Sequence, residues 1–227
     1  MSFQKSEVLF GEDDFKKLKD KKVLVVGVGG VGGYVCEMLA RSGIGEIGLI
    51  DFDIVEKTNI NRQIIALNST IGQKKVDVMK QRLKDINPEI IVNACAEKIT
   101  KNNLTEFDIT NYNYVVDAID SRHDKVELIC YCHENNVNIV SAMGTGNKTL
   151  IPSYEVVDIF STCYDPFAKA VRKKLKRLKT VSKLDVVYSS QPIIKKQESH
   201  AGSVVYHPAM CACVISAFVI DKLIKEN

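Results

Sequence analysis

The chain of 227 residues lacks the spacing patterns that disulfide frameworks and zinc sites need. It has seven cysteines, an odd number, and none of them stands in a Cys-x-x-Cys pair. It also lacks a leading signal peptide. Unpaired cysteines without such a leader are typical of proteins from a reducing compartment. The sequence therefore predicts a cytoplasmic protein.

Long hydrophobic runs are absent as well. The longest, 209–220, is interrupted by Ser216 and stopped by Asp221, so it falls short of the roughly 20 residues that a membrane span requires. We expect it to form a buried C-terminal helix, and we expect no membrane partner. Internal repeats and low-complexity segments are also missing, and 45% hydrophobic residues suffice for one core. These features favour a single domain over residues 1–227.

Acidic residues are missing from one stretch. From Lys169 to Lys183 the chain has eight basic residues and no acidic residue. Because the formal net charge of the whole chain is +3, the remaining residues together carry a net charge of −5. A basic patch on an acidic body indicates a local anionic partner. RNA phosphates would suit it, although a solvated helix face is the simpler alternative. The candidate RNA contacts are Lys169, Arg172, Lys173, Lys176 and Arg177.

What is present is an alternation of strand and helix patterns. Apolar runs at 22–28 and 47–50 flank a helical pattern, which predicts a β-α-β unit of a buried parallel sheet. The pattern continues with helices at 73–86 and 124–134 and strands at 90–94, 114–118 and 137–141. The predicted fold class is α/β, with a Rossmann-like, doubly wound, mostly parallel sheet as a nucleotide-binding core over residues 1–143.

Residues 144–227 break this rhythm, and we expect them to form an α+β extension that binds substrate or RNA and ends in the C-terminal helix. Turn residues at 144–147 precede a short predicted strand at 154–157. Asp165 and Pro166 then favour a helix start. Apolar residues recur at spacings of three and four from Ala168 onward, so this helix should be amphipathic with its basic residues facing outward.

A glycine-rich turn joins the first predicted strand to the first predicted helix. Its glycines would let the backbone approach a pyrophosphate, while the helix N-terminus supplies N–H groups and a positive dipole. Asp51 ends the second strand, where its carboxylate can accept hydrogen bonds from ribose hydroxyls. These features fit NAD, FAD and ATP equally well, so the ligand stays open at this point. The glycines are Gly27, Gly29, Gly30 and Gly32.

Polar residues in the next segment favour ATP. Asn59, Arg62 and Gln63 lie ahead of Lys75, and a hydride-transfer domain has no evident use for such an Arg and Lys. Adenylyl transfer has one, because fixed cations stabilise the charge that builds on the phosphate oxygens. The simpler alternative is a loop arginine and an exposed helix lysine.

Two aspartates follow the strand at 114–118. Ligands of such sheets bind at the carboxyl edge, which makes Asp120 a candidate ligand for Mg²⁺. Asp117 lies nearer the strand and is as easily structural.

Taken in order, these motifs resemble those of the ubiquitin-activating-enzyme-like adenylating proteins, the group of ThiF, MoeB and HesA. The resemblance covers nearly the whole chain and includes segments 51–53, 59–63, 72–75 and 117–120. Within that superfamily the sequence is most similar to the tRNA threonylcarbamoyladenosine dehydratases. The segments that carry this closer likeness are 114–121, 144–148 and Asp165-Pro166-Phe167-Ala168 ahead of a basic helix.

The resemblance implies a site and a reaction. ATP would activate the carboxylate of threonylcarbamoyladenosine in tRNA as an acyl-adenylate, and a nitrogen of the same modification would close a ring with loss of AMP. It further implies a ligase-type enzyme that uses ATP and Mg²⁺, a homodimer, and a sulfur-transfer (cysteine desulfurase) system as a potential partner. The implied nucleotide-binding residues are Gly27, Gly29, Gly30, Gly32, Asp51, Asp53, Asn59, Arg62, Gln63, Lys75 and Asp120. The implied catalytic residues are Arg62, Lys75 and Asp120, with Asp120 on the metal.

Two departures from the family pattern concern charge and sulfur. Many relatives begin with arginines, one of which reaches a partner subunit's ATP, and here the nearest candidate is Lys5. Sulfur-carrier relatives bring two Cys-x-x-Cys pairs for zinc, whereas this chain has Cys130 with Cys132 and Cys211 with Cys213. Residues two apart on a helix point in different directions. We therefore expect no zinc site and expect these cysteines to pack in the core.

The remaining cysteine and histidine candidates are weaker. Cys163 precedes Asp165 in a predicted loop with nothing basic fixed beside it in the sequence, which argues against a catalytic thiol. The histidines show no ligand or triad spacing, so we expect them to be structural. They are His123, His133, His200 and His207.

Three other functions stay open on the sequence. An activator of a small sulfur-carrier or ubiquitin-like protein would share every ATP residue. A nicotinamide-dependent oxidoreductase rests on the glycine turn and Asp51 alone. The third alternative is a non-catalytic module that binds RNA or a protein partner.

Overall fold

The computed structural model describes residues 3–194 and 201–225 and contains a seven-stranded sheet. The strands lie in the order β3-β2-β1-β4-β5-β7-β6, and every neighbouring pair is parallel except β6 with β7. The strands are β1 (Lys22–Val26), β2 (Glu46–Ile50), β3 (Ile91–Cys95), β4 (Tyr114–Asp117), β5 (Ile139–Ala142), β6 (Glu155–Asp158) and β7 (Asp185–Tyr188). The predicted α/β class with a mostly parallel sheet is confirmed.

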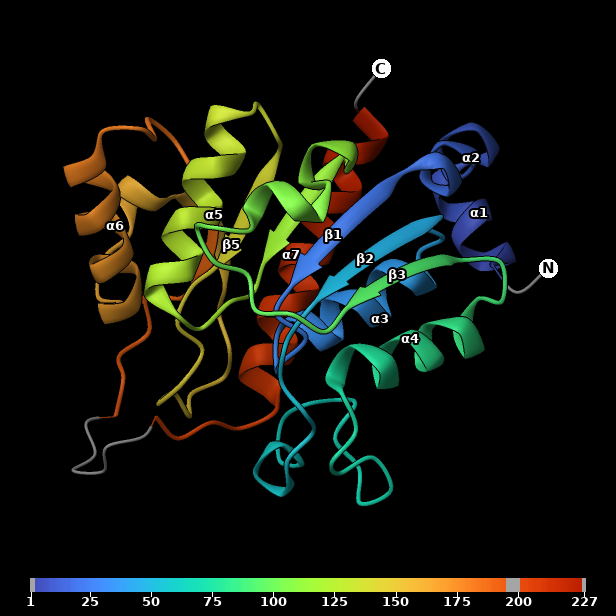
Figure 1. The fold of residues 1–227 in the computed structure, drawn as a ribbon, viewed down its shortest axis with the longest axis horizontal. Coiled ribbons are helices and arrows are strands. Elements are labelled where there is room, and N and C mark those ends of the chain that lie inside the picture. The colour runs from blue at the N-terminus through green and yellow to red at the C-terminus, as the bar shows by residue number, and fades with distance from the viewer. Residues whose placement is uncertain (1–2, 195–200, 226–227) are drawn as a thin grey trace.

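Helices cover both faces of this sheet (Figure 1). The two faces are distinguished by alternation within β1: Val23 and Val25 belong to the core under one helix layer, and Leu24 and Val26 to the core under the other. One layer contains α2 (Glu12–Asp20), α3 (Gly32–Arg41), α4 (Lys75–Ile86) and α7 (Tyr206–Lys225). The other contains α5 (Arg122–Glu134) and α6 (Pro166–Leu178). The short helix α1 (Gln4–Phe10) contacts α2.

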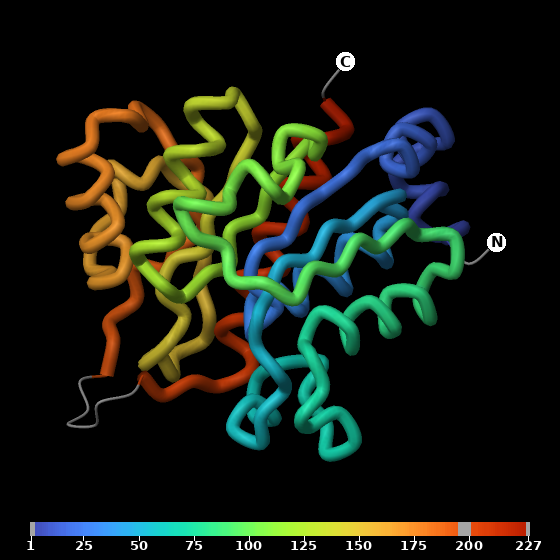
Figure 2. The backbone as a smooth tube through the Cα atoms, viewed as in Figure 1, coloured from blue at the N-terminus to red at the C-terminus, as the bar shows by residue number. Residues whose placement is uncertain are grey.

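The strand register brings the functional candidates to one edge. Val26 at the end of β1 pairs with Ile50 of β2 and Asp117 of β4, and Asp117 pairs with Ser141 of β5. The carboxyl ends of four strands are therefore level. The turn after β1, the loops at 51–74 and the start of α7 lie at this end of the sheet (Figure 2). This is the edge at which open α/β sheets bind their ligands.

Several elements differ from the sequence-based predictions. The helices α1 and α2 and the strand β7 were not predicted, and β7 lies between β5 and β6. The basic helix ends at Leu178 and does not reach Lys183, because Lys179 adopts a left-handed backbone with φ of 59° and closes the helix. Three short 3-10 turns in loops were also not predicted: they cover Lys57–Asn59, Leu104–Phe107 and Ile109–Asn111. A fourth covers Ile159–Ser161.

The C-terminal helix α7 has 20 residues, more than its apolar run suggested, and by length and composition alone it could cross a membrane. Half of its most apolar window is buried inside the molecule. It packs against α2, α3 and the strands β4 to β7. Packing in the core therefore accounts for its apolar composition, as the sequence predicted.

Candidate functional site

The turn after β1 contains two kinds of glycine. Gly27 has φ of 92°, and a Cβ added there would lie 2.7 Å from the carbonyl oxygen of Ala118. A Cβ added at Gly32 would lie 1.8 Å from the carbonyl oxygen of Gly27. Both positions therefore need glycine for the fold itself. Gly29 and Gly30 do not, because an added Cβ would approach its nearest neighbour only to 3.8 and 3.4 Å, respectively.

The N-terminus of α3 opens onto this turn. The helix begins at Gly32, and no side chain of the described residues caps it at Val31. The N–H of Gly33 donates to the Gly29 carbonyl at 3.0 Å. The positive end of the helix dipole lies at this turn and would favour an anion there.

Asp51 joins the end of β2 to the glycine turn. Its Oδ2 accepts a hydrogen bond from the Val28 N–H at 2.6 Å, and its Oδ1 accepts one from the Asp53 N–H at 2.9 Å. Burial raises the pKa of Asp51, while the nearby Lys75 and the two N–H donors oppose that rise. A carboxylate offers about four acceptor positions. These two bonds therefore leave acceptor capacity for a ligand.

Lys75 is the first residue of α4 and is only 5% exposed. Its Nζ lies 2.7 Å from Oδ2 of Asp53, and its backbone N–H donates to the Asp53 carbonyl at 3.0 Å. The alternative of an exposed helix lysine is therefore wrong. Asp53 and Lys75, 22 positions apart, form one ion pair at the carboxyl edge.

Arg62 and Gln63 flank the two glycines that the fold does not require. The aliphatic Cγ of Arg62 lies 3.6 Å from the position of a Cβ at Gly30, and Nε2 of Gln63 is the nearest atom to one at Gly29. Gln63 is buried, and its Oε1 has no hydrogen-bond partner among the described residues. A buried unpartnered amide oxygen is costly and is typical of a place where a ligand completes the hydrogen bonding.

The loop that carries these two residues is held by its own polar side chains. Asn59 is buried and accepts a hydrogen bond from the Glu56 N–H at 3.1 Å, which closes the 3-10 turn. Nη1 of Arg62 donates to the Thr58 carbonyl and to Oδ1 of Asn61, each at 3.0 Å. Asn59 therefore shapes the loop, and the hydrogen bonds to Thr58 and Asn61 of this loop orient the Arg62 side chain.

The two aspartates after β4 have different surroundings. Asp117 is fully buried and forms an ion pair with Lys125 at 2.8 Å, so the structural role considered for it is the one observed. Asp120 is exposed at the carboxyl edge. Burial lowers the pKa of Lys125, and the charge and hydrogen bond of Asp117 oppose this. Lys125 was missed in the sequence, although it shares the buried stripe of α5 with Leu128, Ile129 and Cys132 at helical spacing.

A second polar group follows β5. Lys148 is buried, and its Nζ donates to the Gly144 carbonyl at 2.9 Å. Asp165 accepts hydrogen bonds from the N–H groups of Phe167 and Ala168 with Oδ1 and from that of Gly144 with Oδ2. Asp165 is therefore the N-cap of α6, as predicted, and it also ties α6 to the loop after β5.

The basic helix α6 presents four of its five candidate RNA contacts to solvent. Lys169, Lys173, Lys176 and Arg177 are exposed. Arg172 differs from them: it is half-buried, and its Nη1 donates to the carbonyl of Thr162 at 2.7 Å and to the Thr162 hydroxyl. The guanidinium of Arg172 is thus engaged within the protein.

The cysteines divide by exposure. Cys130, Cys132 and Cys211 are buried, which confirms the predicted core packing, and burial raises the pKa of Cys132 and of Cys211 to about 12. Cys213 is exposed, so the core role predicted for it is wrong: it lies on the outer side of α7. Cys163 is also exposed, with its Sγ 3.7 Å from the Tyr188 hydroxyl. The described residues contain no group of three or more His, Cys, Asp or Glu side chains that could hold a metal ion.

The described histidines fit structural or surface positions. His207, at the start of α7, is buried, and its Nδ1 lies 3.2 Å from the Tyr154 hydroxyl. Burial lowers its pKa, and the charge of Lys148 lowers it further. His123 is an exposed residue near Asp124. His200 lies outside the described residues.

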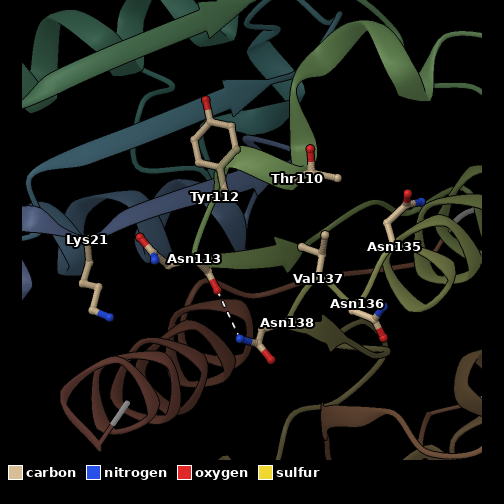
Figure 3. Close-up of a pocket in the computed structure, with 8 residues that line it drawn as sticks. All are labelled: Lys21, Thr110, Tyr112, Asn113, Asn135, Asn136, Val137 and Asn138. Atoms are coloured by element: carbon tan, nitrogen blue, oxygen red, sulfur yellow. Dashed lines mark hydrogen bonds between the residues drawn. The ribbon is translucent and has the colours of Figure 1, made fainter. Parts of the chain in front are cut away.

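One cavity of about 440 Å³ lies at the opposite edge of the sheet. Figure 3 shows its lining, in which Lys21, Asn113 and Asn138 immediately precede β1, β4 and β5, respectively. The Nδ2 of Asn138 donates to the Asn113 carbonyl at 3.3 Å across it. None of the candidate nucleotide residues lines this cavity. It is therefore separate from the site after the glycine turn.

Comparison with known proteins adds to this geometry. Residues 4–227 match the ThiF family. A protein of Haemophilus influenzae named tRNA threonylcarbamoyladenosine dehydratase is 36% identical, over 96% of this chain and 92% of its own length. A more distant relative, the adenylyltransferase and sulfurtransferase UBA4 of Lodderomyces elongisporus, is 37% identical over 67% of this chain but only 34% of its own length.

Solved structures that resemble this chain include a dehydratase of the same name. The E. coli tRNA N6-threonylcarbamoyladenosine dehydratase TcdA in complex with AMP superposes with a TM-score of 0.93 at 36% identity, covering 97% of this chain and 93% of that one. The same enzyme in complex with ATP gives 0.92 at 35% identity with the same coverage. With a family match over almost its whole length, and with the glycine turn, Asp51, Arg62 and Lys75 gathered at one sheet edge, the chain belongs to the ThiF family.

Proposed function

We propose that this chain is an ATP-dependent tRNA threonylcarbamoyladenosine dehydratase. The observation that carries the proposal is the full-length match to dehydratases of that name, including the TcdA structures with ATP and AMP. Its local basis is the site at the carboxyl edge, where Gly29 and Gly30 lie between the N-terminus of α3 and the side chains of Arg62 and Gln63.

The residues present fit a bound ATP. No contact within the protein requires glycine at positions 29 and 30. Close approach of a phosphate to the backbone would explain why these positions have no side chain. Nε2 of Gln63 is the atom nearest to the position of a Cβ at Gly29, and it can donate a hydrogen bond to a phosphate oxygen there. Asp51 keeps acceptor capacity for ribose hydroxyls. Asp53 and Asn59 serve mainly by holding Lys75 and the loop in place.

The reaction divides into two displacements. A carboxylate oxygen of threonylcarbamoyladenosine attacks the α-phosphorus of ATP, the bond to pyrophosphate breaks, and an acyl-adenylate forms. A nitrogen of the same modification then attacks the carbonyl carbon, loses its proton, and expels AMP. The nucleoside thereby loses one water. Because the nucleophile belongs to the substrate, the reaction needs no thiol from the enzyme.

Arg62 and Lys75 stabilise the negative charge that builds on the phosphate oxygens. Lys75 is held by Asp53 before the nucleotide binds, so its ammonium loses little freedom on binding. Arg62 uses Nη1 for the loop, which leaves its other guanidinium donors for phosphates. In this proposal both residues are catalytic.

Asp120 is proposed as the protein ligand of Mg²⁺. It is an exposed carboxylate at the carboxyl edge, and magnesium in such sites is commonly bound by one or two carboxylates together with substrate phosphates. A single carboxylate therefore fits the metal without a cluster of acids. The ion would neutralise phosphate charge when bound.

The tRNA is proposed to contact the outer face of α6. Lys169, Lys173, Lys176 and Arg177 are exposed there and can pair with backbone phosphates. Arg172 supports the start of the helix through Thr162 in place of an exposed contact. The tether from Asp165 to Gly144 keeps α6 next to the carboxyl edge, where the activated nucleoside must lie.

A homodimer is proposed through α1. Val8 and Leu9 are each 80% exposed on this helix, which also carries Lys5. Lys5 would keep the charge of the N-terminal arginine of relatives but lose its bidentate geometry. A sulfur-transfer partner rests on the family resemblance alone. A cytoplasmic location is proposed from the seven free cysteines, and a ligase-type classification from the cleavage of ATP.

Activation of a small sulfur-carrier protein is the alternative function. It shares the ATP residues, but the UBA4 relative matches only 67% of this chain. Pyrophosphate exchange that is stimulated by a protein ending in diglycine, and not by tRNA, would favour it. The oxidoreductase alternative would need NADH to bind where ATP does not, and a non-catalytic module would fail to bind ATP at all.

The test is a mass measurement. The full chain is incubated with ATP, Mg²⁺ and tRNA that carries threonylcarbamoyladenosine, and the nucleosides are then analysed. The expected result is release of AMP and pyrophosphate together with loss of one water from the modified nucleoside. An unchanged nucleoside mass in the presence of all three reagents rejects the proposal.

A further inference from the structure

A lysine with no direct part in the proposed reaction lies buried beneath the site. Lys125 on α5 is fully buried. Its Nζ lies 2.8 Å from Oδ2 of Asp117, 3.1 Å from Oγ of Ser141 and 3.4 Å from the Asp117 carbonyl oxygen. The ring of Phe167, at the start of α6, lies 5.8 Å from the same nitrogen. The ammonium is therefore enclosed by β4, β5 and α6.

Such a pair is not explained by stability. A buried ion pair is costly to desolvate, and apolar side chains of similar volume often give equal or greater stability in its place. What the pair does supply is a fixed orientation of the Asp117 carboxylate. The Ser141 hydroxyl donates to Oδ2 of Asp117 at 2.5 Å, so the ammonium of Lys125 and this hydroxyl together fix the rotation of the carboxylate.

The other oxygen of this carboxylate shapes the chain that follows β4. Oδ1 of Asp117 accepts a hydrogen bond from the Ile119 N–H at 3.1 Å. Asp120 is the next residue. The turn also touches the glycine turn, since the Ala118 carbonyl oxygen lies 2.7 Å from where a Cβ of Gly27 would be. The orientation of Asp117 therefore determines where Asp120 stands relative to the nucleotide loop.

We infer that the buried pair of Asp117 and Lys125 is a positioning device, which holds the 118–120 turn so that Asp120 meets the magnesium ion of bound ATP. Lys125 holds Asp117 by charge, and Asp117 holds the turn through Ile119. Neither residue touches the nucleotide. The inference rests on the proposed function, in which Asp120 is the metal ligand.

Two charge-balanced double variants test it. Asp117→Asn with Lys125→Met retains an oxygen for the Ile119 N–H and needs no counter-ion. Asp117→Ala with Lys125→Met has no acceptor for that N–H. Binding of ATP to each full-length variant is measured by calorimetry, once with excess Mg²⁺ and once with EDTA. In the alanine pair we expect Mg·ATP binding to weaken by about tenfold, as for other groups that orient a metal ligand, with metal-free ATP binding unchanged. The asparagine pair should bind Mg·ATP much as the unmodified protein does.

Equal Mg·ATP affinities of the two double variants would overturn the inference. If the alanine pair does not fold, Lys125→Met alone is measured in its place, and a selective loss of Mg·ATP binding is again required. Glu37→Gln is the matched control, because it breaks the ion pairs that the buried Glu37 of α3 makes with the partly exposed Arg82 of α4 and with Arg41, away from the site. It should lower the melting temperature without altering the ratio of the two affinities.

Asp120→Asn separates this inference from the proposed function. It should weaken Mg·ATP binding selectively, and if it does not, the positioning inference is rejected. The mass measurement on tRNA is independent of that result. A dehydratase that loses water from its nucleoside but shows no selective effect at Asp120 keeps the proposed reaction and loses only the inference.

Discussion

The ammonium of Lys75 lies 2.7 Å from a carboxylate oxygen of Asp53, at the point where the loop after β2 meets the first residue of α4. Lys75 is buried while the side chain of Asp53 is about half exposed. The position of the Lys75 ammonium is thus fixed by its ion pair within the protein, at the same carboxyl edge of the sheet that carries the glycine turn. This relationship decides how Lys75 can act on a phosphate.

Replacing Lys75 by Met should therefore reduce the rate of AMP formation by roughly a hundredfold, since a fixed cation is lost from the charged transition state. The measurement is single-turnover formation of AMP with modified tRNA. Lys80→Met, on the exposed side of the same helix, is the control and should leave the rate within about twofold. A Lys75 variant with a normal rate would remove this residue from the catalytic set.

Alanine at the glycine turn should separate folding from nucleotide binding. Gly27→Ala meets the Ala118 carbonyl at 2.7 Å and a left-handed backbone, and it should cost about 2 kcal/mol or more of unfolding free energy. Gly29→Ala has room within the protein and should keep its melting temperature. Its ATP affinity should nevertheless fall by at least about tenfold, because the added methyl group occupies space that a phosphate needs. Full ATP affinity in Gly29→Ala would contradict the proposed phosphate site.

Removal of charge from α6 should weaken tRNA binding and leave ATP binding unchanged. Each of Lys169→Ala, Lys173→Ala, Lys176→Ala and Arg177→Ala should lower the slope of log affinity against log salt concentration by about one if the replaced side chain pairs with a phosphate. Arg172→Ala should behave differently and lower the melting temperature, because its guanidinium holds Thr162. Filter binding at several salt concentrations distinguishes the two outcomes. An unchanged slope in all four exposed variants would leave α6 a solvated face.

The ion pairs of Glu37 predict a dependence of stability on pH. Burial alone would raise the pKa of this carboxyl, but hydrogen bonds and charge from Arg82 and Arg41 outweigh it and lower the pKa below the usual 4.5. A lowered folded-state pKa contributes stability above the unfolded value, and this stability is lost as the pH falls through the folded value. Glu37→Gln should therefore cost about 2 kcal/mol at pH 7 and progressively less below pH 4.5. Urea unfolding at pH 7, 4.5 and 3.5 measures the difference, and a cost independent of pH would refute the assignment.

The exposed thiols should be alkylated before the buried ones. Their loss should not reduce catalytic activity. Cys163 and Cys213 are exposed, whereas burial raises the pKa of Cys132 and Cys211 to about 12. Iodoacetamide should therefore label the first two in the native protein and the buried ones only after unfolding. Cys163→Ser should retain dehydratase activity within about twofold, since the nucleophile belongs to the substrate. Loss of activity with ATP binding intact would give Cys163 a catalytic role.

Local patterns were sufficient for those parts of the site whose chemistry is contained in a short segment. The glycines after β1 and the cap formed by Asp165 are each readable from a few neighbouring residues. The exposure of Arg172 was not readable in this way. Its helix face looked uniformly basic, yet the 3-10 turn before α6 brings the Thr162 carbonyl to its guanidinium. The exposure of Cys213 was misjudged for a similar reason, because the sequence does not show which side of α7 faces solvent.

By itself the sequence determined the class of fold, the order of the nucleotide-binding motifs and the family resemblance, because alternating apolar periods and short motifs are local properties of the chain. Only the tertiary structure decided that Lys75 pairs with Asp53, that Gln63 lies beside Gly29, and that Lys125 is buried under Asp117. Those contacts depend on the strand order β3-β2-β1-β4-β5, which makes the carboxyl ends of strands distant in sequence into neighbours. The burial of a charged side chain follows from that arrangement in space, and no local pattern encodes it.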